Sequence, residues 1–461
     1  MDEGGAGRST GNEVAPDPRA ARAFAALHAP DAGSADWWRR IADQGTPLVD
    51  RLGPNEIGVT FLWRDPHGSA AVSPLRRVYV DVNSVTDHHS PAPQSLARLR
   101  GSDVWFWQVV LPSDWRGSYV FIPATAGAVA PALIGDDVEK MQQQRQWWRS
   151  IQVHATADPL NRFVARRDGS ASALHLADAP AQTAWTAFDR GRDVNTDPSR
   201  LQELNWCSAR LGTARPVWLY ATGTADPSAA ALRPLVLLLD GRRWHEDLPI
   251  YAALDAETDC GRLPPAVYVL IDAIDSRQRE RDIACNPVFW QALQTELLPE
   301  VAVTTPHSTR AQDTVVAGQS LGGLGAVYAA LQFPERFGAA ASQSGSFWWP
   351  HVELLHAPFG ESCPRRPGAR GALAERVASS SRASAPLRVC LDVGRREDVM
   401  IDLTESLRDA LASAGHDVVC RDYEGGHDAL CWRGALVDAL ARLLAPAGAA
   451  APVSHSPGDP A

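Results

Sequence analysis

Short apolar segments that end at or beside Gly, Asp or Ser recur after about residue 186, with helical segments between them. They are RPLVLLLDG (233–241), AVYVLIDA (266–273), DTVVAGQS (313–320), GAAASQSG (338–345) and LRVCLDVG (387–394). Continuous apolar runs of this length are typical of parallel strands that are covered on both faces. The pattern predicts a doubly wound α/β domain with a mostly parallel sheet, whose chemistry lies at the carboxyl ends of the strands.

The first part of the chain has a different pattern. Between about residues 50 and 125, segments rich in Val, Tyr, Phe and Trp alternate with turn residues: IGVTFLWR, RRVYVDVN, DVWFWQVVL and SYVFIP. Their spacing predicts a small antiparallel β-sandwich of immunoglobulin-like kind. DVWFWQVVL is almost continuously apolar, so we expect this strand to be buried on both sides. The following KMQQQRQWWRSIQV has helical composition.

The length of 461 residues predicts two domains. We expect a disordered tail over 1–20, an N-terminal β-sandwich domain with flanking helices over 21–165, a linker over 166–185, the α/β domain over 186–445 and a second disordered tail over 446–461. Tryptophan is frequent, with 16 copies. For the pairs Trp37-Trp38 and Trp147-Trp148, helix packing is the favoured interpretation over a place in a binding cleft.

Bulk composition excludes several classes of function. The net charge of −10 gives no support to nucleic-acid binding. The beginning of the sequence, MDEGGAGRSTGNEV, lacks the apolar run of a secretory signal, and no segment reaches membrane-spanning length. The 7 cysteines are scattered without a CxxC pair, which argues against a disulfide scaffold and a zinc site. We expect a cytoplasmic protein.

The segment VVAGQSLGGLGAVYAA contains a GxSxG motif, with Ser320 at its centre. A strand precedes this serine and a helix follows it, which is the context of a nucleophile elbow in an α/β-hydrolase. Glycines on both sides permit the tight turn that lifts the hydroxyl above the sheet. The amide of Leu321, at the helix N-terminus, is then placed to stabilise an oxyanion.

A nucleophilic serine needs a base and an acid, which follow it in this order along an α/β-hydrolase chain: serine, acid, histidine. His427 comes after the strand-like DVVCRDY and two glycines, and it precedes a helix, so it is the predicted base. The loop GRREDVM should carry the acid that orients it. Glu397 is preferred over Asp398, and Asp392 is a weaker candidate; the alternative is that these acids pair with the neighbouring arginines.

Basic and aromatic residues are expected around the serine. The amide of Gly241 or Arg242 is the predicted second oxyanion donor. Loops at the same edge contain further arginine and aromatic side chains: Arg242, Trp244, Arg277, Arg279, Arg281, Phe347, Trp348 and Trp349. Each alone is more often a surface or core residue. Together they predict a large, aromatic, anionic substrate held by stacking, cation–π contacts and hydrogen bonds.

GGHDALCWRG (425–434) has a second interpretation as a metal or thiol site. His427, Asp428 and Cys431 do not form a recognised ligand set, so we predict no bound metal. Asp428 is expected to cap the next helix and Cys431 to have no chemical role. Trp432 is either a packing residue or part of the pocket wall.

The whole sequence from about 50 to 445 resembles the enterochelin (enterobactin) esterases, cytoplasmic hydrolases of the esterase-D-like α/β-hydrolase group. The segments that carry the resemblance occur in the family's order: VTFLWRDP, WWRS…ADPLN, LLDGRRWHE, PPAVYVLIDAID, VVAGQSLGGL, PERFGAAASQSGSFWWPH and GGHDALCWRG. The resemblance implies a substrate that is a ferric tris-catechol siderophore built on a trilactone. Hydrolysis of its ester bonds after import would help to release the iron.

The resemblance also implies roles for individual residues. Ser320 matches the family's nucleophile, His427 its base and Glu397 the glutamate of an Arg-Glu pair. Arg279 and Asn286 match a loop beside the pocket, where Asp282 replaces a glutamate of the family. The predicted substrate-binding residues are Arg242, Trp244, Arg279, Asn286, Trp348, Trp349 and Trp432. No cofactor is expected, because iron arrives with the substrate.

Two alternatives stay open at this point. One is an esterase for another catechol conjugate, a linear siderophore or an acyl ester. The other is a siderophore-binding protein that has kept the fold and lost the activity. The presence of Ser320 and His427 together with nearby acids favours an enzyme, because a binding protein has no use for that set. The sequence does not predict an oligomeric state.

Overall fold

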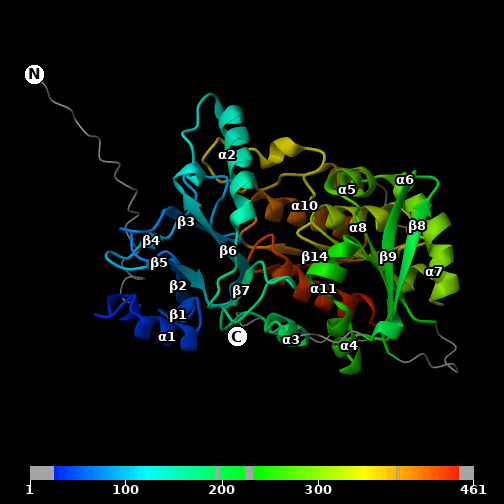
Figure 1. The fold of residues 1–461 in the computed structure, drawn as a ribbon. Coiled ribbons are helices and arrows are strands. Elements are labelled where there is room, and N and C mark those ends of the chain that lie inside the picture. The colour runs from blue at the N-terminus through cyan, green and yellow to red at the C-terminus, as the bar shows by residue number, and fades with distance from the viewer. Residues whose placement is uncertain (1–24, 193–196, 224–231, 381–382, 384, 446–461) are drawn as a thin grey trace, which may run out of the picture. The chain divides into compact units, whose positions relative to one another are not determined.

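The computed structural model describes residues 25–192, 197–223, 232–380, 383 and 385–445 (Figure 1). The tails expected over 1–20 and 446–461 lie outside the described residues. The chain forms two compact units, one of Met1–Val164 with Ser170–Pro180 and one of Ala165–Gly169 with Ala181–Ala461. Below, they are called unit 1 and unit 2.

Unit 1 contains two antiparallel sheets. The first has the order β1-β2-β5-β4, formed by β1 (Leu48–Arg51), β2 (Glu56–Arg64), β5 (Val104–Pro112) and β4 (Ala97–Arg98). The second has the order β3-β6-β7, formed by β3 (Leu75–Val82), β6 (Arg116–Thr125) and β7 (Ser172–His175). Both sheets contribute to one core, in which Phe61 of β2 and Val80 of β3 are buried with Tyr119 of β6.

Two helices of unit 1 bury the paired tryptophans. Helix α1 (Ala35–Gln44) buries Trp37 and Trp38, and α2 (Asp137–Ile151) buries Trp147 and Trp148. The indoles of each pair meet edge to face, with ring centroids 4.7 Å and 5.7 Å apart respectively. Each pair therefore packs its own helix onto unit 1, as the favoured interpretation of the sequence predicted.

Two expectations for unit 1 need correction. Strand β5 is not buried on both sides, since Phe106 to Val110 are only half-buried. The sheet turns one face of β5 toward the shared core, against which Trp107 and Val109 pack while remaining only partly buried. Residues 166–185, for which the composition suggests a linker, include β7, which pairs with β6 from Arg116 to Tyr119.

Unit 2 has an α/β fold with a mostly parallel sheet. The strand order is β15-β14-β13-β12-β10-β11-β9-β8, and the strands from β10 to β15 are parallel. These are β8 (Leu201–Ser208), β9 (Thr213–Ala221), β10 (Leu235–Leu238), β11 (Val267–Ile271), β12 (Thr314–Gln319), β13 (Ala339–Gln343), β14 (Arg388–Gly394) and β15 (Asp417–Tyr423). The antiparallel β8–β9 hairpin forms one edge.

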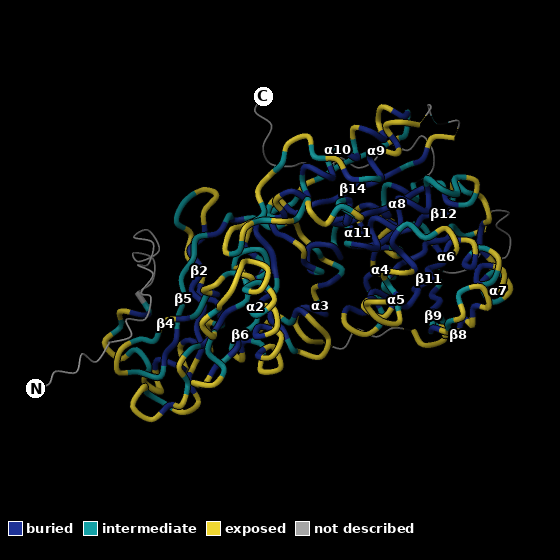
Figure 2. Tube along the Cα trace, turned by 90° about the horizontal axis from the view of Figure 1, so that it is seen from above, coloured by how far each residue is buried: buried dark blue, intermediate teal, exposed yellow. Residues whose placement is uncertain are grey.

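Helices cover both faces of this sheet. They are α3 (Thr186–Asp189), α4 (Tyr251–Asp259), α5 (Ser276–Ile283), α6 (Pro287–Ala292), α7 (Leu298–Thr304), α8 (Leu321–Gln332), α9 (Ala372–Ala378), α10 (Val399–Ser413) and α11 (Ala429–Leu443). In Figure 1, α4 and α11 lie on one side of the strands and α8 and α10 on the other. Strands β11, β12 and β14 are dark blue in Figure 2, because they are buried along almost their whole length.

None of the helices in the described parts of the chain has the length and apolar content needed to cross a membrane.

Candidate active site

Ser320 occupies a strained turn between β12 and α8. Its φ and ψ are 56° and −121°, a conformation that residues with a side chain rarely adopt. The turn is tight: a Cβ on Gly318 would lie 2.4 Å from the carbonyl carbon of Gly322. The strand, strained serine and helix follow one another as the GxSxG motif predicts.

The backbone around Ser320 is held by the segment after β13. The Ser320 amide donates to the Gln343 carbonyl at 3.0 Å, and the Ser346 amide donates to the Ser320 carbonyl at 2.9 Å. The two hydroxyl oxygens of Ser320 and Ser346 are 3.3 Å apart. Sequence reasoning missed Ser346; its only signal is a small polar residue at the end of a strand that neighbours β12.

His427 and Glu397 form a close pair at the same edge of the sheet. Nδ1 of His427 lies 2.8 Å from Oε2 of Glu397. Glu397 follows β14 and His427 follows β15, and these parallel strands are neighbours. The carboxylate side chain is only 4% exposed, whereas the imidazole is 43% exposed. One edge of the ring therefore meets a buried acid while much of the rest meets solvent.

The other acids of this region have different positions. Asp398 is exposed, and Asp392 is buried in β14 with its Oδ1 2.9 Å from Nε of Arg421. Of the neighbouring arginines, Arg395 contacts Asp422 and Arg396 contacts Glu424. The structure therefore places Glu397 against His427 and Asp392 against Arg421.

The second oxygen of Glu397 is also occupied. Oε1 accepts hydrogen bonds from the Gly394 amide at 2.8 Å and from the Ser344 hydroxyl at 2.6 Å. The hydroxyl of Tyr423 is 3.3 Å away. Burial, followed by the nearby charge of Glu397, raises the pKa of Tyr423 well above its usual range, so this phenol remains a donor. Sequence reasoning missed Ser344 and Tyr423, because no local motif marks them.

The predicted oxyanion donors lie in two neighbouring loops. Leu321 begins α8, so its amide is one of the first four of the helix, which have no acceptor within the helix. Gly241 and Arg242 begin the helical turn after β10, which leads into a π-helical segment at Arg243–Asp247. β10 pairs with β12, so both loops emerge side by side.

Arg279 holds these two loops together. It donates from Nε and Nη2 to the two carboxylate oxygens of Asp240, at 2.5 and 2.7 Å. Nη2 also donates to the carbonyl of Gln319 at 3.1 Å. Asp240 itself has a positive φ of 57°. The guanidinium predicted to bind substrate thus fastens the turn after β10 to the residue before Ser320.

Several other predicted substrate-binding residues have structural contacts instead. Trp244 is fully buried and donates to Gln319 at 3.2 Å, because the helical turn after β10 directs its ring into the core. Asn286 caps α6 through Val288 and also donates to the Arg281 carbonyl. The fully buried ring of Trp244 is not open to a substrate, contrary to the prediction. Substrate contact by the half-buried Asn286 stays a prediction.

The other predicted substrate-binding residues differ in their exposure to solvent. Arg242 is half exposed and pairs with Asp272 and Glu246. Trp432 is 3% exposed and packs edge to face on His427, with ring centroids 4.7 Å apart, so it supports the histidine rather than forming an open pocket wall. Trp348 and Trp349 are half-buried and keep part of their surface open.

The residues of GGHDALCWRG separate into different tasks. Asp428 caps α11, with its Oδ1 2.9 Å from the amide of Leu430, as predicted. Cys431 is buried in the first turns of this helix. Nδ1 of His427 faces Glu397. Asp282, which stands where the family has a glutamate, forms a buried ion pair with Arg215.

The chain is similar to known proteins over most of its length. A family model described as "Enterochelin esterase, N-terminal" matches residues 58–185, and one described as "Putative esterase" matches residues 208–443. The iron(III) enterobactin esterase of Dickeya dadantii (strain 3937) is 46% identical over 418 residues, which are 91% of this chain and 94% of that protein. This chain belongs to the enterochelin esterase family. The resemblance found in the sequence is confirmed.

Two further members of the enterochelin esterase family are informative. The crystal structure of the enterobactin esterase from Shigella flexneri in the presence of enterobactin is 40% identical, with a TM-score of 0.74 over 89% of this chain and 98% of that one. The iron(III) salmochelin esterase of Escherichia coli O6:H1 is 31% identical over 421 residues, covering 88% of this chain and 93% of that protein.

Proposed function

We propose that the protein is a serine esterase that hydrolyses the trilactone ester bonds of a ferric catecholate siderophore such as enterobactin. The observation that carries the proposal is the His427–Glu397 pair at 2.8 Å, at the sheet edge where Ser320 occupies its strained turn. The substrate follows from the 46% identity to an iron(III) enterobactin esterase over nearly the full chain.

The mechanism assigns one task to each residue. Ser320 Oγ attacks the ester carbonyl carbon while Nε2 of His427 removes the hydroxyl proton. Glu397 accepts the Nδ1 proton in a hydrogen bond, which orients the ring and stabilises the imidazolium. The amides of Leu321 and of Gly241 or Arg242 stabilise the oxyanion.

The acyl–oxygen bond then breaks. The leaving alkoxide takes the proton from His427, and the acyl group remains on Ser320. A water molecule, deprotonated by the same histidine, hydrolyses this acyl-enzyme and restores the free serine. Each cycle therefore consumes one water molecule and opens one ester bond.

The substrate also explains the aromatic surface after β13. A ferric tris-catecholate is a bulky anion with aromatic rings, and the half-buried Trp348 and Trp349 offer faces for stacking. The iron is part of the substrate, and we propose that the enzyme needs no cofactor or metal of its own.

Two further assignments belong to this proposal. We place the protein in the cytoplasm, and the support is that no disulfide joins any two of the cysteines, which are Cys207, Cys260, Cys285, Cys363, Cys390, Cys420 and Cys431, all within the described residues. We assign an immunoglobulin-like topology to the sandwich of unit 1, supported by its two antiparallel sheets with a shared core.

Product analysis by mass spectrometry tests the function. The protein is incubated with ferric enterobactin, and we expect linear dihydroxybenzoyl-serine products that are absent with Ser320→Ala. Intact ferric enterobactin after incubation with the wild type contradicts the proposal. Binding of the siderophore without hydrolysis, unchanged in Ser320→Ala, supports the binding-protein alternative instead.

A glucosylated siderophore is the second candidate substrate, because an iron(III) salmochelin esterase is 31% identical. The 46% identity to an enterobactin esterase favours the unmodified siderophore. The ratio of kcat/KM for ferric enterobactin and ferric salmochelin decides between them, and we expect enterobactin to be preferred.

A further inference from the structure

Ser344 is a buried serine in an unfavourable backbone conformation. It directly follows β13, is fully buried, and has a φ of 49°. Its amide donates to the Asp392 carbonyl at 2.7 Å, which holds the backbone in place. A residue with a side chain in this region of φ costs free energy that glycine would avoid. The strain indicates that the side chain itself has a use.

The directions of the hydrogen bonds at Ser344 follow from the chemistry of its partners. The indole Nε1 of Trp432, 2.9 Å away, can only donate. The carboxylate of Glu397, 2.6 Å away, can only accept. The single hydroxyl proton therefore points at Glu397, and Trp432 donates into a lone pair of Oγ. Donation from Trp432 polarises the hydroxyl and strengthens its bond to the acid.

The same carboxylate meets His427 through its other oxygen, at 2.8 Å. Fixing Oε1 restricts rotation of the carboxyl group, and so it fixes the direction in which Oε2 faces the imidazole. We infer that Ser344 is a positioning residue for Glu397, and through it for His427. The inference rests on the proposed function, in which His427 is the base.

The segment that contains Ser344 also holds the nucleophile. Gln343 accepts from the Ser320 amide, and Ser346 donates to the Ser320 carbonyl. A short stretch after β13 thus contacts the serine turn through its backbone and the acid through the Ser344 side chain. This arrangement fixes the acid and the nucleophile relative to one another.

Ser342, in β13 two residues before Ser344, provides a matched control. It is also buried, at 1% exposure, and its Oγ has no hydrogen-bond partner among the described residues. Loss of the hydroxyl from Ser342 removes the same atoms from nearly the same depth, without removing a bond to Glu397.

The experiment measures kcat and KM of the full-length protein with p-nitrophenyl butyrate and with ferric enterobactin. Ser344→Ala should lower kcat about tenfold with KM within about twofold, since one charge-assisted bond is lost. Ser342→Ala should keep both constants within about twofold. In a Glu397→Gln background, adding Ser344→Ala should lower kcat by less than about twofold, because the acid it positions is already gone.

Three outcomes overturn the inference: equal kcat for the two alanine variants, an unreduced tenfold loss in the Glu397→Gln background, or a loss that appears in KM alone. If Ser344→Ala does not fold, Ser344→Gly replaces it, because glycine tolerates the backbone conformation while lacking the hydroxyl. A wild type that hydrolyses neither ester contradicts the proposed function itself. An active wild type with an unaffected Ser344→Ala contradicts only the positioning role.

Discussion

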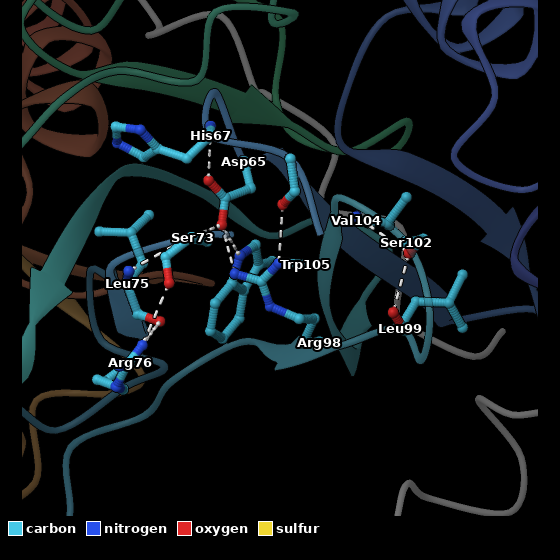
Figure 3. A network of polar contacts seen from close by, with 11 residues as sticks. Asp65, His67, Ser73, Leu75, Arg76, Arg98, Leu99, Ser102, Val104 and Trp105 are labelled. Carbon is cyan, nitrogen blue, oxygen red and sulfur yellow. Dashed lines mark hydrogen bonds and ion pairs between the residues drawn. The ribbon is translucent and has the colours of Figure 1, made fainter. Parts of the chain in front are cut away.

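Two buried carboxylates, one in each unit, have similar hydrogen-bond donors but different charged partners. Asp65 of unit 1 accepts from the Ser73 hydroxyl at 2.7 Å, the His67 amide at 2.9 Å and the Trp105 indole at 3.3 Å, and it pairs with Arg98 (Figure 3). Glu397 of unit 2 accepts from a serine and an amide, and an indole supports the serine. Both carboxylates accept from a serine hydroxyl and a backbone amide; the indole donates directly to Asp65 but only to the serine beside Glu397.

The difference lies in the charged partner. Arg98 is always protonated and only 13% exposed, so the network around Asp65 is neutralised and closed. Glu397 instead faces His427, whose imidazole ring is 43% exposed to solvent. Under the proposed mechanism, Glu397 acts in catalysis because its partner is an imidazole that is open to solvent, whereas Asp65 acts in stability alone because its partner is a guanidinium.

The largest expected effect is that of the nucleophile. Ser320→Ala should lower kcat for ferric enterobactin by a factor of about 10⁴ or more, because no other hydroxyl replaces the attacking group. The matched serine of the closed network, Ser73→Ala, should leave kcat unchanged and lower the free energy of unfolding by about 1 kcal/mol. Steady-state kinetics and denaturant unfolding of both variants measure this. Wild-type turnover by Ser320→Ala would contradict the assignment of catalysis to this site of unit 2.

The second effect concerns the acid that faces the histidine. Glu397→Gln should lower kcat by about 10²- to 10⁴-fold, since the imidazole loses the charge that orients it and stabilises its protonated form. Asp398→Asn should stay within about twofold, because Asp398 is exposed and Glu397 contacts His427. The kcat values on one ester substrate decide, and equal losses in the two variants would show that the acid is shared or misassigned.

The third effect is on stability alone. Asp65→Asn should lower the free energy of unfolding by about 3 kcal/mol at pH 7, because Arg98 is left buried without its counter-charge. Activity of the folded protein should not change. Denaturant unfolding followed by circular dichroism, with kcat measured in the same preparations, tests both statements.

The wild type and the Asp65→Asn variant also test how the free energy of unfolding depends on pH. Burial raises the pKa of Asp65, but hydrogen bonds from Ser73, His67 and Trp105, with Arg98, outweigh it, and the net pKa is lowered. A lowered pKa means that the contribution to stability is complete above the unfolded value of about 3.9 and is lost as the pH falls below it. The stability gap between wild type and Asp65→Asn should therefore narrow below about pH 4. A gap that widens on acidification contradicts this sign.

Sequence reasoning found the parts of the site that local patterns encode. Ser320 could be located because its strand, glycines and helix are contiguous, and His427 because two glycines and a helix start surround it. The preference for Glu397 over Asp398 came mainly from the family resemblance. In the structure, the burial of Glu397 distinguishes it from Asp398. The segments that contact Glu397, which are the end of β13 and β15, are not contiguous with it in sequence.

The missed and misplaced residues have a common physical cause. Ser344 and Tyr423 reach Glu397 from strands on either side of β14, so no contiguous motif contains the contact. Trp244 was expected at the substrate because it follows a strand end, but the helical turn after Asp240 rotates its ring inward. A strand end predicts which edge of a sheet a residue occupies; it does not predict where the side chain points.

The smallest expected effect compares the two indoles. Trp432→Phe removes the donor to Ser344 but keeps a ring against His427, and Tyr423, 3.0 Å from the Ser344 oxygen, can donate in its place. We expect kcat to fall only about threefold. Trp105→Phe removes a weaker, 3.3 Å bond to Asp65, so kcat should not change.

Both substitutions remove the same atoms from buried positions, so each should cost a similar cavity penalty, about 1 to 3 kcal/mol in unfolding free energy. Stability therefore cannot separate them, and kcat can. A threefold loss confined to Trp432→Phe would show that the indole acts on the acid through Ser344. Equal kcat values for the two variants would mean that the indole of Trp432 only fills space, and that Tyr423 or the Gly394 amide suffices to hold Glu397.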